Sequence, residues 1–248
     1  MPRYRLTVEY DGAPFVGWQR QGNGQTVQAV LEDAVLAFSG ERVEVAGAGR
    51  TDTGVHAAGQ VAHIDLLSDR FAPRAVMNAV NAYLQPLPVA VIAAEAVPDE
   101  FHARFSAIWR AYRYVIVNRG APLALDAGRA WHIKAPLDVG AMQAGAQRLL
   151  GHHDFTSFRA THCQSKSPAK TLDLLTVSRH GERVVVEARA RSFLHHQVRN
   201  MVGTLKLVGE GKWRPDDVTA ALAARDRAAA GPTAPAEGLT LVAVGYPG

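Results

Sequence analysis

A mixed α/β (α+β) fold of two related lobes is predicted by two features of the sequence: strand and helix patterns alternate, and one strand pattern recurs about 110 residues later. Residues 112–120 (YRYVIVNRG) echo residues 4–12 (YRLTVEYDG). We therefore expect an N-terminal lobe over residues 1–105 and a C-terminal lobe over 106–248. Each would hold a mixed or antiparallel sheet with helices on one face, and the two lobes would form a central cleft. Chance similarity of two short strands is the alternative reading of the echo.

In the first half, residues 4–10 alternate polar and apolar side chains and stop at Asp11-Gly12, which is typical of a strand that ends in a turn. Apolar residues with helical spacing then run from Val27 to Phe38, with Thr26 as N-cap and Gly40 as the stop. Next, we expect strands over 42–46 and 60–66, a helix opened by a proline over 73–84, and a strand over 89–97.

In the second half, the same reasoning predicts a strand over 112–120 and a helix over 139–150. Strands over 173–179 and 183–189, a helix over 195–208 and a last strand over 239–245 follow. Residues 225–238 are rich in Ala, Pro and Gly and are predicted to form a loop.

The composition is that of a globular chain: 48% of the 248 residues are hydrophobic and 20% are charged. No run of apolar residues is long enough for a membrane span, and no secretory signal opens the sequence, so we expect a cytoplasmic protein. Cys163 is the single cysteine, which excludes an internal disulfide and a multi-thiolate metal site. The net charge of +4 is compatible with a polyanionic partner.

Residues 46–59 are the most unusual stretch, because four glycines in fourteen residues surround Arg50, Asp52 and His56. A glycine-rich hairpin loop is the plain alternative, but functional side chains concentrate on loops of this kind. The stretch lacks the Gly-Lys-Ser/Thr of a phosphate loop and the third glycine of a dinucleotide fingerprint. Asp52-Thr-Gly occurs once, whereas an aspartic protease needs two carboxylates that share a proton. A guanidinium two positions away lowers the pKa of an aspartate, so we expect Asp52 to be ionised and suited to nucleophilic attack or ion pairing.

Residues 101–114 interleave Arg104, Arg110 and Arg113 with aromatic residues. Guanidinium groups neutralise phosphates and aromatic rings stack on exposed bases, so this mixture suits looped or single-stranded nucleic acid. A strand edge with its aromatic residues in the core and its arginines in water is the alternative.

The predicted helix over 195–208 has a buried apolar stripe and a cationic face that carries His195, Arg199, Gly203 and Lys206. A solvated face is the alternative for Arg199. Adjacent histidines diverge on a helix, so we expect no metal site there. Residues 154–166 hold many hydroxyls and cations, among them Arg159, and would line a substrate groove or form an ordinary loop.

Together these stretches resemble the tRNA pseudouridine synthase A family, whose enzymes convert uridines 38 to 40 of the tRNA anticodon arm to pseudouridine. Seven segments in the family's order carry the resemblance: EYDG with GWQR (9–12, 17–20), AGRTDTGVH (48–56), FHARFSA (101–107), YRY (112–114), DFTSFR (154–159), HHQVRN (195–200) and AEGL (236–239). The resemblance implies a two-lobed cleft and a homodimer that binds the tRNA anticodon stem-loop without metal or organic cofactor.

By the same resemblance, Asp52 matches the catalytic aspartate, Arg199 its basic partner and Tyr112 the tyrosine that stacks on the target uracil. Arg50 matches a residue used around the flipped nucleotide. Arg104, His56 and Arg159 are further candidates for substrate binding. Two other classes stay open: a non-catalytic RNA-binding module, and a uridine methyltransferase that uses the Cys163 thiolate.

Overall fold

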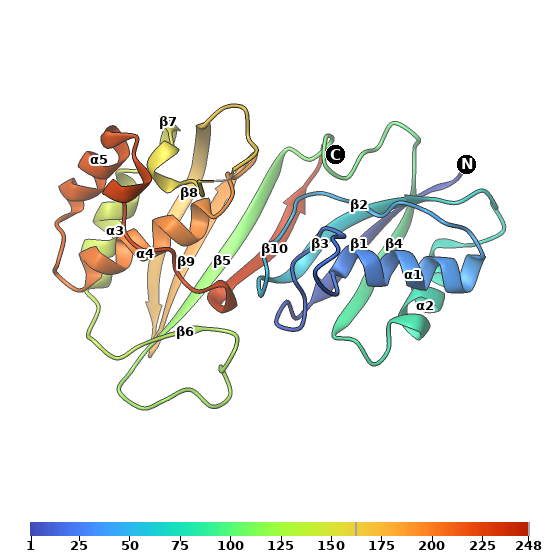
Figure 1. Ribbon diagram of the computed structural model, residues 1–248, viewed down its shortest axis with the longest axis horizontal. Coiled ribbons are helices and arrows are strands. Elements are labelled where there is room, and N and C mark those ends of the chain that lie inside the picture. The colour runs from blue at the N-terminus through green and yellow to red at the C-terminus, as the bar shows by residue number, and fades with distance from the viewer. Residues whose placement is uncertain (162, 248) are drawn as a thin grey trace. The chain divides into compact units, whose positions relative to one another are not determined.

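The computed structural model describes residues 1–161 and 163–247 (Figure 1). Its contacts divide the chain into two compact units. The first holds Met1–Ile108 and the residues from Thr240 onward, and the second holds Trp109–Leu239. Among the described residues, no helix is both long and apolar enough to cross a membrane.

The sheet of the first unit has β1 at its centre. Its strands are β1 (Arg3–Tyr10), β2 (Ala46–Gly47), β3 (His56–Asp65), β4 (Val89–Val97) and β10 (Leu239–Gly245). The order is β4-β1-β3, with antiparallel pairing throughout, and β2 pairs antiparallel with the far edge of β3. On that same edge, β10 pairs in parallel with the beginning of β3.

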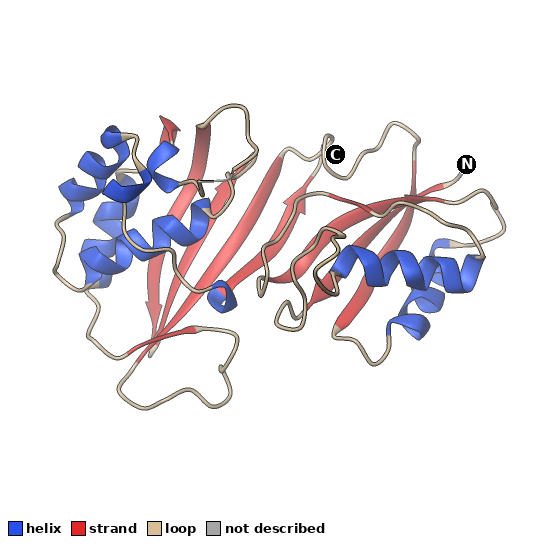
Figure 2. Cartoon of the chain, in the orientation of Figure 1, coloured by secondary structure: helices blue, strands red, loops and turns tan. Residues whose placement is uncertain are grey.

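The alternation in β1 positions its apolar side chains in the core of this unit. Tyr4, Leu6, Val8 and Tyr10 are all buried, as period-two alternation predicts. Helices α1 (Val27–Ser39) and α2 (Pro73–Leu84) belong to the same unit (Figure 2). The predicted limits of both helices are confirmed, and the residues at their ends explain them. The Thr26 hydroxyl accepts from the Ala29 amide at the start of α1, left-handed Gly40 ends α1, and Pro73 opens α2.

The strands of the second unit pair antiparallel in the order β5-β9-β8-β7, and β6 pairs in parallel with β5. The strands are β5 (Trp109–Asn118), β6 (Trp131–Ile133), β7 (Gly151–Asp154), β8 (Ala169–His180) and β9 (Arg183–Ala190). The helices are α3 (Val139–Gln147), α4 (Gln197–Gly209) and α5 (Pro215–Ala224), with short 3₁₀ turns η1 (Thr156–Phe158), η2 (Arg227–Ala229) and η3 (Ala236–Gly238).

The two units repeat one order of elements, which confirms the predicted relation between them. The first runs β1-α1-β2-β3-α2, and the second runs β5-α3-β8-β9-α4 with β6 and β7 inserted. The strand pairing is also repeated. In the first unit, β1 pairs antiparallel with β3, and β3 pairs with β2. In the second unit, β5 pairs antiparallel with β9, and β9 pairs with β8. This is the split β-α-β-β-α order of ferredoxin-like units.

Several predicted boundaries were wrong: β5 begins at Trp109 and not at residue 112, β8 begins at Ala169 and not at 173, and α3 ends at Gln147 and not at 150. Three further differences lie near the candidate residues. The strand expected over 42–46 is reduced to β2, because the backbone of Val45 bonds to side chains of α1 instead of to a strand. The next strand begins at His56 rather than at residue 60, so His56 lies on a strand and not in the preceding loop. Helix α4 begins at Gln197, because His196 has a left-handed backbone with φ 62°. The structure also adds β6, β7 and α5, which the sequence patterns had not indicated.

Candidate active site

The Asp52 loop, residues 48–55, connects β2 to β3 and is anchored one residue before Asp52. The hydroxyls of Thr51 and Tyr10 share a hydrogen bond of 2.7 Å in the interior of the first unit. The Trp18 amide also donates to the Thr51 carbonyl at 3.0 Å. Burial raises the pKa of Tyr10 to about 12, so its phenol stays neutral and able to donate. The backbone next to Asp52 is therefore fixed, while the Asp52 side chain is half-buried.

The chain between β1 and α1 packs directly against this loop. Gly17 has φ +97°, and a Cβ atom there would lie 2.8 Å from the Thr51 carbonyl oxygen and 3.3 Å from the Asp52 carbonyl carbon. Only glycine combines this backbone conformation with this approach. After the loop's turn, the Val55 amide donates to the Asp52 carbonyl at 3.1 Å. The Asp52 peptide is thus held on both sides.

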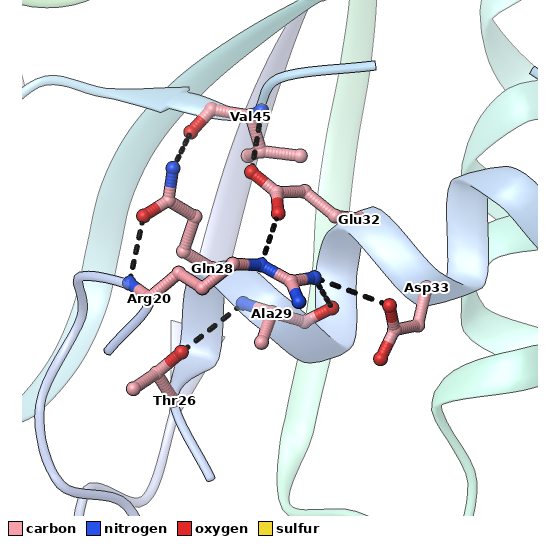
Figure 3. Close-up of polar contacts among 7 residues, drawn as sticks. All are labelled: Arg20, Thr26, Gln28, Ala29, Glu32, Asp33 and Val45. Atoms are coloured by element: carbon pink, nitrogen blue, oxygen red, sulfur yellow. Dashed lines mark hydrogen bonds and ion pairs between the residues drawn. The ribbon is translucent and has the colours of Figure 1, made fainter. Parts of the chain in front are cut away.

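Helix α1 holds two segments next to the loop: the end of the 11–20 segment, at Arg20, and the residue before β2, Val45 (Figure 3). Gln28 accepts from the Arg20 amide at 2.9 Å and donates to the Val45 carbonyl at 3.2 Å. Glu32 accepts from the Val45 amide at 3.2 Å and from the Arg20 guanidinium at 2.7 Å. One turn of helix therefore fixes the end of the 11–20 segment and the residue just before β2, and through them the Asp52 loop.

The other two candidates near this loop have different environments. Arg50 is exposed. His56, at the start of β3, is buried, and its Nδ1 atom lies 3.0 Å from the Gly12 amide and 3.1 Å from a carboxylate oxygen of Asp11. His56 thus contacts the turn that follows β1.

Arg104 lies on a separate, firmly held turn of the first unit, residues 101–106. His63 accepts from the Ala103 amide at 3.2 Å, and Tyr246 donates to the Ala103 carbonyl at 2.7 Å. Burial lowers the pKa of His63 to about 4, which keeps its ring neutral and able to accept. The turn displays Arg104 beside Phe105, which is 73% exposed, with the guanidinium carbon 5.7 Å from the ring centroid.

In the second unit, Tyr112 and Tyr114 lie on one face of β5. Tyr112 is half-buried and meets Phe193 edge-on at 5.2 Å between ring centroids, which restrains the plane of its ring. Tyr114 is fully buried and donates to the Pro235 carbonyl at 2.8 Å. Burial raises the pKa of Tyr114 well above its ordinary value, and the positive charge of Arg199 lowers that pKa by a smaller amount.

Arg199 lies in the first turns of α4 and is bonded to the 225–238 segment through Ala234. The Arg199 Nε donates to the Ala234 carbonyl at 2.8 Å, and the Ala234 amide donates to the Arg199 carbonyl at 3.1 Å. The cationic face expected on this helix is therefore not a solvated one at Arg199 and Lys206, which are half-buried, whereas His195 is exposed and precedes the helix. A Cβ on Gly203 would collide with the Pro232 carbonyl, and Lys206 pairs with Glu210 at 2.7 Å.

Arg159 follows η1 and is half-buried. The next residue ties this segment to α4, since the Ala160 amide donates to the His195 carbonyl at 2.9 Å. Within the second unit, the segments that carry Arg159 and Arg199 are therefore joined at the N-terminus of α4.

Comparison with known proteins identifies the family. A sequence model of the family described as tRNA pseudouridine synthase matches residues 6–106 and 146–247. The chain belongs to the tRNA pseudouridine synthase family. It is therefore an enzyme of the isomerase class.

Close relatives extend this match along almost all of the chain. The tRNA pseudouridine synthase A of Paramagnetospirillum magneticum is 63% identical over 246 residues, 99% of this chain and 96% of the relative. Proteins of the same name from Rhodospirillum centenum and Parvibaculum lavamentivorans are 61% and 57% identical, each over 99% of this chain and all of the relative.

Sequence reasoning misjudged Arg110 and missed two residues that support the candidates, Tyr10 and Gln28. Arg110 is 8% exposed, although the sequence grouped it with arginines suited to phosphates, and it donates to the Arg191 carbonyl at 2.7 Å. Tyr10 holds the Asp52 loop at Thr51 from 41 positions away, and Gln28 bonds Val45, just before β2, from 17 positions away. A phenol on the buried face of β1 was the one signal that pointed to Tyr10, and no local signal pointed to Gln28.

Proposed function

We propose that this chain converts uridine to pseudouridine at positions 38, 39 and 40 of the tRNA anticodon stem-loop, with Asp52 as nucleophile. Family membership and relatives named tRNA pseudouridine synthase A support the reaction class. The observation that carries the assignment of Asp52 is its half-buried carboxylate on a loop whose backbone is fixed at Thr51 and Val55. A nucleophile needs this combination of access and restraint.

The reaction breaks the bond from ribose C1′ to N1 of uracil, turns the base and joins C1′ to C5. The proton on C5 leaves to solvent and N1 gains one, so the product is an isomer of the substrate and no redox or phosphoryl chemistry is needed. The Asp52 carboxylate would act by adding to the uracil ring or by attacking C1′ as the bond opens. Both routes need an ionised carboxylate.

Arg199 and Tyr112 supply the remaining parts of the proposed site. The family resemblance supports Arg199 as the guanidinium partner of the Asp52 carboxylate. The target base is stacked in RNA, and extruding it costs a few kcal/mol. Tyr112, its ring restrained by Phe193, provides an aromatic surface that replaces the lost stacking.

Three further residues complete the proposed contacts to RNA, and a fourth supports the loop from inside the first unit. Exposed Arg50 and Arg104 bind phosphate or the displaced nucleotide, and Arg159 contacts the substrate from the second unit. His56 acts from behind the loop, where it contacts Asp11 and Gly12. The family resemblance also supports a cytoplasmic homodimer as the working form.

The test is release of tritium from C5 of labelled uridine in tRNA with no cofactor added. Asp52→Asn should abolish release while tRNA affinity, measured by filter binding, stays within a few fold. Asp69→Asn, an exposed carboxylate of the same unit, is the matched control and should release tritium like wild type. In the same assay, Tyr112→Phe should retain more activity than Tyr112→Ala.

Three results would reject the proposal. Normal turnover by Asp52→Asn would remove Asp52 as nucleophile. Tight tRNA binding without any tritium release by the wild type would favour an RNA-binding module. Loss of activity in Cys163→Ala, together with a requirement for a methyl donor, would favour the methyltransferase.

A further inference from the structure

A buried polar cluster lies directly behind Arg199 in the second unit. At its centre is Asn200, which is 0% exposed. Its Oδ1 accepts from the Thr233 hydroxyl at 2.6 Å and from the Arg227 guanidinium at 3.2 Å, and its amide donates to the Phe158 carbonyl at 2.9 Å. Every polar atom of this side chain is satisfied, so Asn200 is held rigidly.

The cluster clamps the backbone of residues 230–234 onto α4. Arg227 donates to the Gly231 carbonyl at 2.9 Å and to the Thr233 hydroxyl at 3.1 Å. The Thr204 hydroxyl donates to the Asn200 carbonyl at 2.8 Å and accepts from the Gly231 amide at 2.9 Å. These bonds fix the chain immediately before Ala234.

Ala234 transmits this restraint to Arg199. It is the next residue after Thr233, and it exchanges two hydrogen bonds with Arg199, one of them to Nε. The Arg199 Nε–H is directed at the Ala234 carbonyl, so the orientation of the guanidinium plane follows the backbone of residues 230–234.

We propose that Thr233, Asn200 and Arg227 are positioning residues, which act through Ala234 to fix the orientation of the Arg199 guanidinium that its proposed role in the reaction requires. This inference rests on the proposed role of Arg199. The three residues themselves touch neither substrate nor the reacting atoms. Their effect on catalysis therefore depends on the presence of Arg199.

The experiment is a double-mutant cycle between Thr233 and Arg199. Thr233→Val keeps the side-chain volume and removes the hydroxyl. We expect it to lower kcat by about 10-fold, with KM for tRNA changed by less than about 3-fold, because the reacting geometry and not the binding is lost. In the Arg199→Ala background, Thr233→Val should cause no further loss. Thr233→Ser restores the hydroxyl and should restore kcat, and Thr219→Val, an exposed threonine of α5, controls for the substitution itself.

The outcomes separate this inference from the proposed function. If Arg199→Ala alone turns over normally, the proposed role of Arg199 fails and the inference fails with it. If Arg199→Ala is impaired but Thr233→Val costs the same in both backgrounds, the cluster only stabilises the fold and the inference alone is overturned. Should Thr233→Val not fold, Arg227→Lys breaks the clamp from the other side, and the same dependence on Arg199 is required of it.

Discussion

Replacing Thr51 by Val tests whether the hydroxyl pair behind Asp52 matters for both stability and catalysis. Both partners of the 2.7 Å bond are buried, with Thr51 6% and Tyr10 5% exposed. A buried hydroxyl left without its partner costs about 1–3 kcal/mol. Thr51→Val removes the hydroxyl that pairs with Tyr10, so we expect the free energy of unfolding to fall by about 1–3 kcal/mol. For a chain of this size that corresponds to a fall in Tm of roughly 2–12 °C.

The same change should reduce turnover. Thr51 directly precedes Asp52, and loss of its anchor lets the carboxylate move, which we expect to lower kcat by about 10-fold or more with little change in KM. Urea unfolding and C5 tritium release measure the two effects. Thr51→Ser keeps the hydroxyl and should stay close to wild type. Thr53→Val makes the same replacement on an exposed threonine of the loop. Equal stability and equal turnover in Thr51→Val and Thr53→Val would refute the reasoning.

Two further predictions concern parts of the fold away from the loop. Gly203→Ala pushes a methyl group into the Pro232 carbonyl, so we expect the free energy of unfolding, measured in urea, to fall by about 1–3 kcal/mol. Gly120→Ala, whose added methyl group meets nothing nearby, should leave it unchanged. Similar values for the two variants would contradict the packing at Gly203. The pKa of His63 is lowered from 6.5 to about 4, so between these values the unfolded chain binds more protons and the free energy of unfolding should rise with pH. Unfolding curves measured from pH 4 to 7 should lose that part of the slope in His63→Asn, and an unchanged slope would show that His63 does not cause it.

Local chemistry made part of the fold predictable. The limits of α1 follow from Thr26 and Gly40, which act within one turn of the helix ends. Pro73 sets the start of α2 in the same way. Prediction failed where a backbone group bonds to a side chain distant in sequence: Val45 has the pattern of a strand, but its amide and carbonyl bond to Glu32 and Gln28 of α1. Backbone groups accept any suitable donor or acceptor that the fold brings near, and local patterns do not show which.

For the candidate site, the sequence located residues but not the contacts that hold them. The crowding of Arg50 and Asp52 among glycines indicated a functional loop without any structure. The bond from Tyr10 to Thr51 and the bond from Arg199 to Ala234 each link residues more than thirty positions apart. No periodicity records such pairs, because they depend on how the elements pack.

The parallel pairing of β10 with β3 gives the first unit a discontinuous chain. Thr240 and Leu241 pair with His56 and Ala57, on the strand that begins where the Asp52 loop ends. During synthesis, the ribosome makes the entire second unit before it makes these residues. A nascent chain that has emerged only as far as Ile108 thus lacks the strand that pairs with the beginning of β3. The unit that carries the proposed nucleophile becomes complete only after its neighbour has been translated.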